Sequence, residues 1–272
     1  MSLAYWWRWW RALPNNPIYL REKGGWGTPN PFYATLMRYS PFVLIGAILT
    51  GLCSGTGGAF LNGNEALLAA ACLLWLPNFL LTAVSLYGSL IVPALTAPAI
   101  SMEMDRGTWE ILRTTPLPTI EIVLAKMLGA LSRLRIWLLL LALSALQGGL
   151  SFLVLLVFDS ETAVLSPVIG FSVFIRPWLE IFFAAGMGMY LSLRTRSAIT
   201  ALVGTYGLIL AIKLVNNSAI WSFILLNAFN TPDWVMTLAV TAGPTAVYAL
   251  LLTFLIIGLV HQAKKLEAGV YE

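Results

Sequence analysis

The sequence contains few charged residues: Asp, Glu, Lys and Arg make up 10% of it, whereas hydrophobic residues make up 59%. Soluble domains carry about 25% charged and roughly 45–50% apolar residues. So few charges cannot cover the surface of a globular protein of 272 residues. The composition therefore excludes a soluble enzyme, a disordered tail and a nucleic-acid-binding module, and it predicts an integral membrane protein.

The chain also lacks the residues that most catalytic and metal sites need. It has one histidine, His261, and two cysteines, Cys53 and Cys72, both in apolar stretches. These are too few ligands for a zinc site, and we interpret the cysteines as packing residues. No His-Glu-x-x-His pair and no phosphate-binding Gly-x-x-x-x-Gly-Lys-Ser/Thr loop is present. We expect no catalytic residue, no metal and no cofactor bound by this chain.

Long runs without charge mark the candidate membrane spans. A helix needs about 20 apolar residues to cross the hydrocarbon core. We expect an all-α integral membrane protein whose six transmembrane helices lie at about 41–61, 67–97, 126–157, 168–193, 198–215 and 235–260. They form one domain over residues 1–272, with an interfacial segment at 1–40, the bundle at 41–260 and a tail at 261–272. The apolar segment 218–229 is too short to cross, and we expect it on the outer face.

The positions of the basic residues predict the topology. Most Lys and Arg residues precede the first span, follow the second and the fourth, or lie in the tail, whereas the other connections carry only acids. The positive-inside rule then places both termini in the cytoplasm. The expected location is the cell (inner, cytoplasmic) membrane, crossed several times.

The first residues combine aromatic and basic side chains in one short segment. Trp and Arg at such spacing predict an amphipathic helix in the membrane interface. Such an elbow either moves when the protein changes state or is a plain anchor. The residues concerned are Trp6, Trp7, Arg8, Trp9, Trp10 and Arg11.

Four polar residues fall inside or near the expected spans. Charges at membrane depth are costly, and they are a functional hypothesis by default. We interpret Arg176, Glu180 and Lys213 as a structural ion pair or, alternatively, as contacts for a transported substrate. Asn78 is either part of a path through the bundle or the donor of an interhelical hydrogen bond.

The connection between the second and third spans carries the densest charge. On one continuous helix, one stripe would hold Glu103, Arg106, Glu110 and Arg113, and the opposite stripe Met104, Thr108, Ile111 and Leu112. The charged stripe suits water or a protein partner, and the other stripe suits the bundle. Gly107 costs roughly 1 kcal/mol inside a helix, so we expect the regular helix to begin at Thr108. A solvated connector without a partner is the alternative.

This connection also resembles a family signature. The stretch from Glu103 to Glu110, followed by Thr115-Pro116-Leu117 and then by Glu121 to Lys126, resembles the pattern of type-2 ATP-binding-cassette (ABC) permeases. Asn16-Pro17 with Arg21 and Glu22 is similar to the start of that family. The resemblance implies the transmembrane subunit of an ABC exporter, with Arg21 and Glu22 in the elbow and a coupling helix that docks on an ATPase. The coupling residues would be Glu103, Asp105, Arg106, Gly107, Thr108, Trp109, Glu110 and Arg113.

The resemblance also implies the partners. They would be two ABC ATPase subunits that bind ATP and Mg, a second permease subunit, identical or not, and membrane lipid, but no nucleic acid. The chain would then not be an enzyme by itself. A non-transporting membrane scaffold or anchor subunit is the first alternative. An intramembrane enzyme is a third hypothesis, against which the missing catalytic groups argue.

Overall fold

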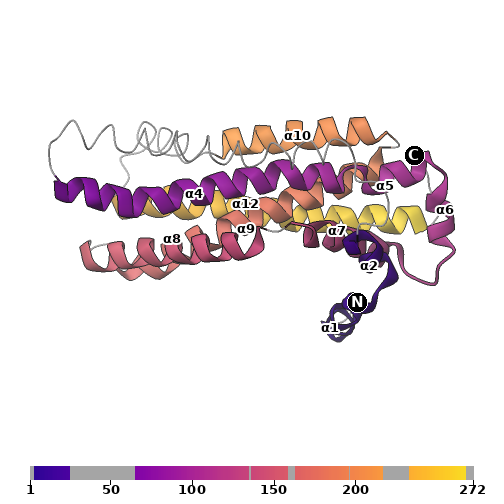
Figure 1. The fold of residues 1–272 in the computed structure, drawn as a ribbon, viewed down its shortest axis with the longest axis horizontal. Coiled ribbons are helices and arrows are strands. Elements are labelled where there is room, and N and C mark those ends of the chain that lie inside the picture. Colours follow the sequence, from indigo (N-terminus) through magenta and orange to yellow (C-terminus); the bar gives the residue numbers. More distant parts are fainter. Residues whose placement is uncertain are drawn as a thin grey trace.

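The computed structural model describes residues 3–24, 65–134, 136–158, 163–195, 197–216 and 233–267. All regular secondary structure in these ranges is helical, and the helices run side by side in an elongated bundle (Figure 1). The expected first span at 41–61, the segment 218–229 and Cys53 lie outside the described residues.

Three short helical segments begin the chain: α1 (Leu3–Ala12), the 3-10 turn η1 (Leu13–Asn15) and α2 (Pro17–Gly24). Asn16 ends the turn and starts α2, because its Oδ1 accepts a hydrogen bond from the backbone N–H of Ile18 at 2.9 Å. Pro17 then occupies the first helical position, where no N–H is needed. Figure 1 shows α1 and α2 at the side of the bundle, next to α7.

Five described segments are long and apolar enough to cross a membrane. This identifies the chain as a multi-pass membrane protein. The helices concerned are α4 (Glu65–Thr96) with its continuation α5 (Pro98–Asp105), α8 (Trp137–Phe158), α9 (Ser166–Arg194, preceded by the turn η2, Ala163–Leu165), α10 (Ala198–Val215) and α12 (Asp233–Glu267).

The expected single helix at 126–157 is wrong, because the structure divides it into α7 (Thr119–Ser132) and α8. Arg133 sits at the break, where its Nε donates to the backbone carbonyl of Glu22 in α2. Trp137 Nε1 donates to the carbonyl of Leu131 at 3.0 Å, in addition to the backbone N–H of Leu134, and so ties the start of α8 to the end of α7. These side-chain contacts hold the turn in a way that a pattern of apolar residues does not reveal.

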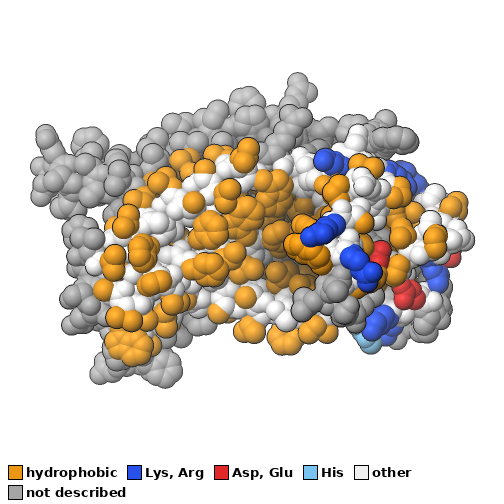
Figure 2. Space-filling model, turned by 90° about the horizontal axis from the view of Figure 1, so that it is seen from below, with side chains coloured by type: hydrophobic (Ala, Val, Ile, Leu, Met, Phe, Trp, Pro, Cys, Tyr) orange, Lys and Arg blue, Asp and Glu red, His pale blue; other side chains and the backbone are white. Residues whose placement is uncertain are grey.

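Helix α9 lies at the centre and packs against α4, α8, α10 and α12. Its contact with α8 is so close that a Cβ on Gly148 would meet the carbonyl oxygen of Gly170 at 2.8 Å. Nearer α7, Trp137 and Trp178 stack with ring centroids 5.6 Å apart. Figure 2 shows hydrophobic side chains over most of the described surface on one side, with Lys and Arg side chains gathered toward one end.

Candidate functional site

The connection that follows α4 is two short helices rather than one. Helix α5 ends at Asp105, the chain turns at Arg106 and Gly107, and α6 (Thr108–Arg113) follows. Gly107 has a φ of 71°, which only glycine adopts readily. Helix α6 therefore starts at Thr108, as expected, and Figure 1 places it at one end of the bundle.

The turn at Gly107 separates the residues of the expected charged stripe, so the prediction of one continuous stripe is wrong. Glu103 lies on α5 and is only 7% exposed, whereas Arg106 and Glu110 are exposed. The opposite stripe divides as well: Met104 and Leu112 are half-buried and pack against the core, whereas Thr108 is exposed and Ile111 is 69% exposed. Trp109, which belongs to neither stripe, is 2% exposed and lies in the core. The exposed tip of the connection consists of Asp105, Arg106, Gly107, Thr108, Glu110 and Ile111.

Glu103 belongs to a buried ion-pair cluster centred on Lys126 of α7. The Lys126 side chain is 1% exposed, and its Nζ lies 2.6 Å from Glu103 Oε1 and 3.1 Å from Glu22 Oε1 of α2. The same Nζ donates to the carbonyl oxygen of Ala99 in α5 at 3.3 Å. An ammonium buried this deeply is stable only when carboxylates and hydrogen bonds surround it. Three helices from distant parts of the sequence thus share one cation.

Two arginines extend this cluster toward the surface. Arg21 Nη2 lies 3.4 Å from Glu103 Oε1, and Arg133 Nη2 lies 3.4 Å from Glu22 Oε2. We call Arg21, Glu22, Glu103, Lys126 and Arg133 the junction cluster. One carboxylate oxygen, Glu103 Oε2, is buried and has no hydrogen-bond partner in the described part of the chain.

Helix α2 packs directly on α7 beside the junction cluster. A Cβ on Gly129 would meet the carbonyl oxygen of Tyr19 at 3.2 Å, and the Cβ of Glu22 is closer still. Only glycine leaves room for α2 at this point, so the ion pairs form across two helices in backbone contact.

Two hydrogen bonds connect α7 to α1 and to α12. Tyr5 of α1 donates a hydrogen bond to Glu121, and the backbone N–H of Thr119 donates to Glu267 Oε1 of α12 at 2.7 Å. Burial raises the pKa of the Glu121 carboxyl above its ordinary value, because ionisation is costly away from water. Helix α7 is therefore joined to α1, α2, α5 and α12.

Sequence reasoning selected Glu103, Arg21 and Glu22 but missed Lys126 as a site residue. The signal was present, because Lys126 is the one cation within the mostly apolar α7, a helix that the bundle buries on most sides. Its two carboxylate partners lie 104 and 23 residues away in the sequence, so no local pattern pairs them.

A second polar cluster lies within the candidate spans. Glu180 of α9 accepts from Arg176 Nε at 3.1 Å, from Lys213 Nζ of α10 at 2.6 Å and from Ser85 Oγ of α4 at 2.7 Å. The structure thus brings Arg176, Glu180 and Lys213 together. Asn78 is exposed on α4, about 10 Å along the helix from Ser85, and its side chain bonds no described residue.

The N-terminal tryptophans are distributed on both sides of α1. Trp7 and Trp10 are 59% and 57% exposed, and Arg11 lies over the Trp7 ring, 5.0 Å from its centroid. Trp9 packs against the core instead, and Arg8 is exposed. The side chain of Trp6 lies outside the described residues.

In the described ranges, no three His, Cys, Asp or Glu side chains come together as metal ligands would. No family model, curated protein or solved structure matches the chain.

Proposed function

We propose that this chain is the transmembrane subunit of an ABC exporter and that α6 is its coupling helix. The observation that supports this function best is the junction cluster. Three stretches that resemble the permease signature, around Glu22, Glu103 and Lys126, are far apart in the sequence and meet at one point beside α6. A bundle without its own nucleotide site needs such a connection to a partner that supplies energy.

The junction cluster gives this proposal a physical mechanism. An ATPase subunit that displaces α6 moves α5 with it, because the two are joined by two residues. The buried ion pairs of Lys126 resist separation of α5, α7 and α2, so the displacement reaches the N-terminal helices and the bundle together. ATP and Mg are bound by the ATPase subunit. This chain supplies the translocation path and the helices that transmit the displacement of α6 to the bundle.

The exposed tip suits a protein partner. Ile111 adds a large exposed apolar side chain to the exposed charges of Asp105, Arg106 and Glu110. Docking surfaces combine an apolar centre, which contributes affinity, with rim charges, which determine orientation and partner choice. An isolated connector in water gains nothing from such an isoleucine.

The rest of the proposal concerns the assembly. The chain has six spans, with the first at 41–61, and both termini in the cytoplasm of a cell whose inner membrane it crosses. The helix α1 is the interfacial elbow. Two permease subunits and two ATPase subunits form the exporter, and the Lys and Arg side chains at one end of the bundle accord with a cytoplasmic position for α6.

Reversing the charge of the exposed tip tests the proposal. Asp105→Lys combined with Glu110→Lys changes two exposed acids, and the ATPase should no longer co-purify with the protein. Glu103 is left intact, because a lysine there would face Lys126 and unfold the junction. The matched control, Arg194→Glu with Lys264→Glu, reverses two exposed charges outside α6 and should retain the ATPase. Wild-type levels of ATPase with the first variant would contradict the proposal, as would a wild-type protein that purifies with no ATPase.

A further inference from the structure

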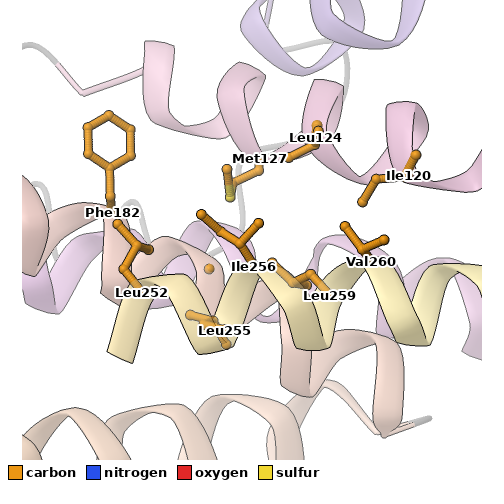
Figure 3. Close-up of a pocket in the computed structure, with 10 residues that line it drawn as sticks. Ile120, Leu124, Met127, Phe182, Leu252, Leu255, Ile256, Leu259 and Val260 are labelled. Atoms are coloured by element: carbon orange, nitrogen blue, oxygen red, sulfur yellow. The ribbon is translucent and has the colours of Figure 1, made fainter. Parts of the chain in front are cut away.

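An apolar cavity of about 310 Å³ lies between α7, α9 and α12. Figure 3 shows Leu124 and Met127 of α7 facing Ile256 and Val260 of α12, with Phe182 of α9 at one end. The lining side chains are hydrocarbon apart from the thioether of Met127, so no donor or acceptor is available for a polar ligand. The volume lies at the lower end of the range for ligand pockets.

The mouth of the cavity opens onto an apolar surface. Ile256 lines the cavity and is still 52% exposed, and its neighbours Phe254 and Ile257 are 68% and 61% exposed. In a membrane protein such a surface lies among lipid chains rather than in water. The molecule that enters this cavity therefore comes from the hydrocarbon.

A row of residues on α12 leads from the cavity to an exposed lysine. Leu252, Ile256, Val260 and Lys264 are spaced by four residues, so each lies about one turn further along the helix and about 40° further around it than the one before. The first three line the cavity, and Lys264 lies about 6 Å beyond Val260. Lys264 is exposed, and it forms no ion pair with any residue that the structure describes.

The row has the length of one membrane leaflet. From Leu252 to Lys264 it extends about 18 Å, and half of the hydrocarbon core is about 15 Å thick. A phospholipid has its parts in the same order as this row: an apolar acyl chain first, and then, beyond the glycerol, a charged phosphate.

We propose that the cavity binds one acyl chain of an anionic phospholipid whose phosphate contacts Lys264. The choice of a phospholipid over a protein segment rests on the order of features along α12: a hydrocarbon-lined cavity first, and after it an exposed cation, Lys264, that pairs with no residue in the described ranges. The site is independent of the ATPase, so its test does not depend on the proposed function.

Photochemical labelling tests this site directly. The full-length protein is placed in phosphatidylcholine nanodiscs that contain phosphatidylglycerol with a diazirine on one acyl chain, and labelled peptides are identified after irradiation. We expect labelling at Leu124 and Met127, on the inner wall of the cavity. Ile256→Trp fills the mouth and should reduce this labelling to the level found without irradiation. Phe254→Trp, on the lipid-facing side of the same helix, should leave it unchanged.

The headgroup contact is tested with the charge of Lys264. One basic residue near an anionic lipid contributes about 1 kcal/mol, so Lys264→Gln should reduce labelling of the cavity by the phosphatidylglycerol probe about fivefold. Arg8→Gln, an exposed cation on α1, is the control and should have no effect on this labelling. A photoreactive phosphatidylcholine should label the cavity less than phosphatidylglycerol does, and Lys264→Gln should remove that difference.

Three results would overturn the proposal. The first is absence of labelling inside the cavity, which means that no lipid chain occupies it. The second is equal labelling of the cavity in Ile256→Trp and Phe254→Trp. The third is equal labelling by the two lipids in the wild type, which removes the role of Lys264.

Discussion

Replacing Lys126 by Met removes the cation that joins α2, α5 and α7. Two carboxylates, Glu103 at 2.6 Å and Glu22 at 3.1 Å, then lose a buried partner. Breaking a buried ion pair by removing one side costs about 3–5 kcal/mol. Arg21 and Arg133 remain 3.4 Å from the same carboxylates, so we expect the lower end of that range.

A loss of about 3 kcal/mol corresponds to a decrease of roughly 6–12 °C in the midpoint of thermal unfolding. The assay heats the detergent-solubilised protein and measures the fraction that still elutes as a single species. Lys264→Met is the matched control, because Lys264 is exposed and forms no ion pair with a described residue; its effect should stay within about 0.5 kcal/mol. Adding Glu103→Leu to Lys126→Met removes both charges of the closest pair and should recover part of the loss.

If Lys126→Met lowers the midpoint no more than Lys264→Met does, the junction cluster does not stabilise the bundle. The prediction is also contradicted if the effects of Lys126→Met and Glu103→Leu simply add, since residues in one ion-pair cluster should show a coupling of about 0.5–3 kcal/mol.

Three further variants test other parts of the structure. Gly148→Ala should lower the unfolding midpoint, because its Cβ would meet a backbone oxygen of α9 at 2.8 Å and overpacking costs about 1–3 kcal/mol. Gly149→Ala is the control and should not lower the midpoint, because its Cβ would meet no described neighbouring atom within 4 Å. Equal midpoints for the two variants would contradict the close contact of α8 with α9. Glu121→Gln should raise the unfolding midpoint at neutral pH. The pKa of Glu121 is raised in the folded protein, so the wild type loses stability as the pH rises and this carboxyl ionises, whereas glutamine does not ionise. The gain should therefore disappear as the pH falls toward 4.5, and a gain that is independent of pH would refute this explanation. Gly107→Ala should weaken co-purification of the ATPase, because alanine at this positive φ costs about 1–2 kcal/mol of backbone strain. Asparagine tolerates the same φ better, so Gly107→Asn should weaken co-purification less. Equal effects of the two variants would exclude strain as the cause.

The sequence was sufficient to locate most of the spans. The expected ranges 67–97, 168–193 and 198–215 agree with α4, α9 and α10 within a few residues, because long charge-free runs have few alternatives in a membrane. Helix α12 is longer than expected, since it continues from the apolar run through Lys264 to Glu267. A basic residue at a helix end does not stop the helix, and the bond from Thr119 to Glu267 fixes this last turn.

The site was less predictable than the spans. The turn at Gly107 was foreseen from the cost of glycine in a helix, but its effect on direction was not: it turns Glu103 inward and Ile111 outward. Helical periodicity assigns faces only within one continuous helix. The junction cluster depends on contacts between residues up to 111 positions apart, and tertiary packing alone decides which of several cations becomes buried.

The ion pairs of Glu180, unlike the junction cluster, could be predicted from the sequence. Arg176 and Glu180 are spaced four residues apart in an otherwise apolar helix, and this spacing places them on the same face. Because an isolated charge in a span is so costly, a partner was expected, and Lys213 was the remaining charge at that depth. Here local spacing and membrane energetics together were sufficient.

A photoreactive amino acid at position 111 shows whether α6 docks on an ATPase subunit. Ile111 is 69% exposed in the exposed tip of the connection that follows α4, and Leu210, 68% exposed on α10, provides a control of equal exposure. Irradiation of the intact assembly in native membranes, followed by mass spectrometry, identifies what each position touches. We expect a covalent product with an ATPase subunit from position 111 and none from position 210. Products from position 111 with lipid alone, or with no protein, would contradict the docking of α6.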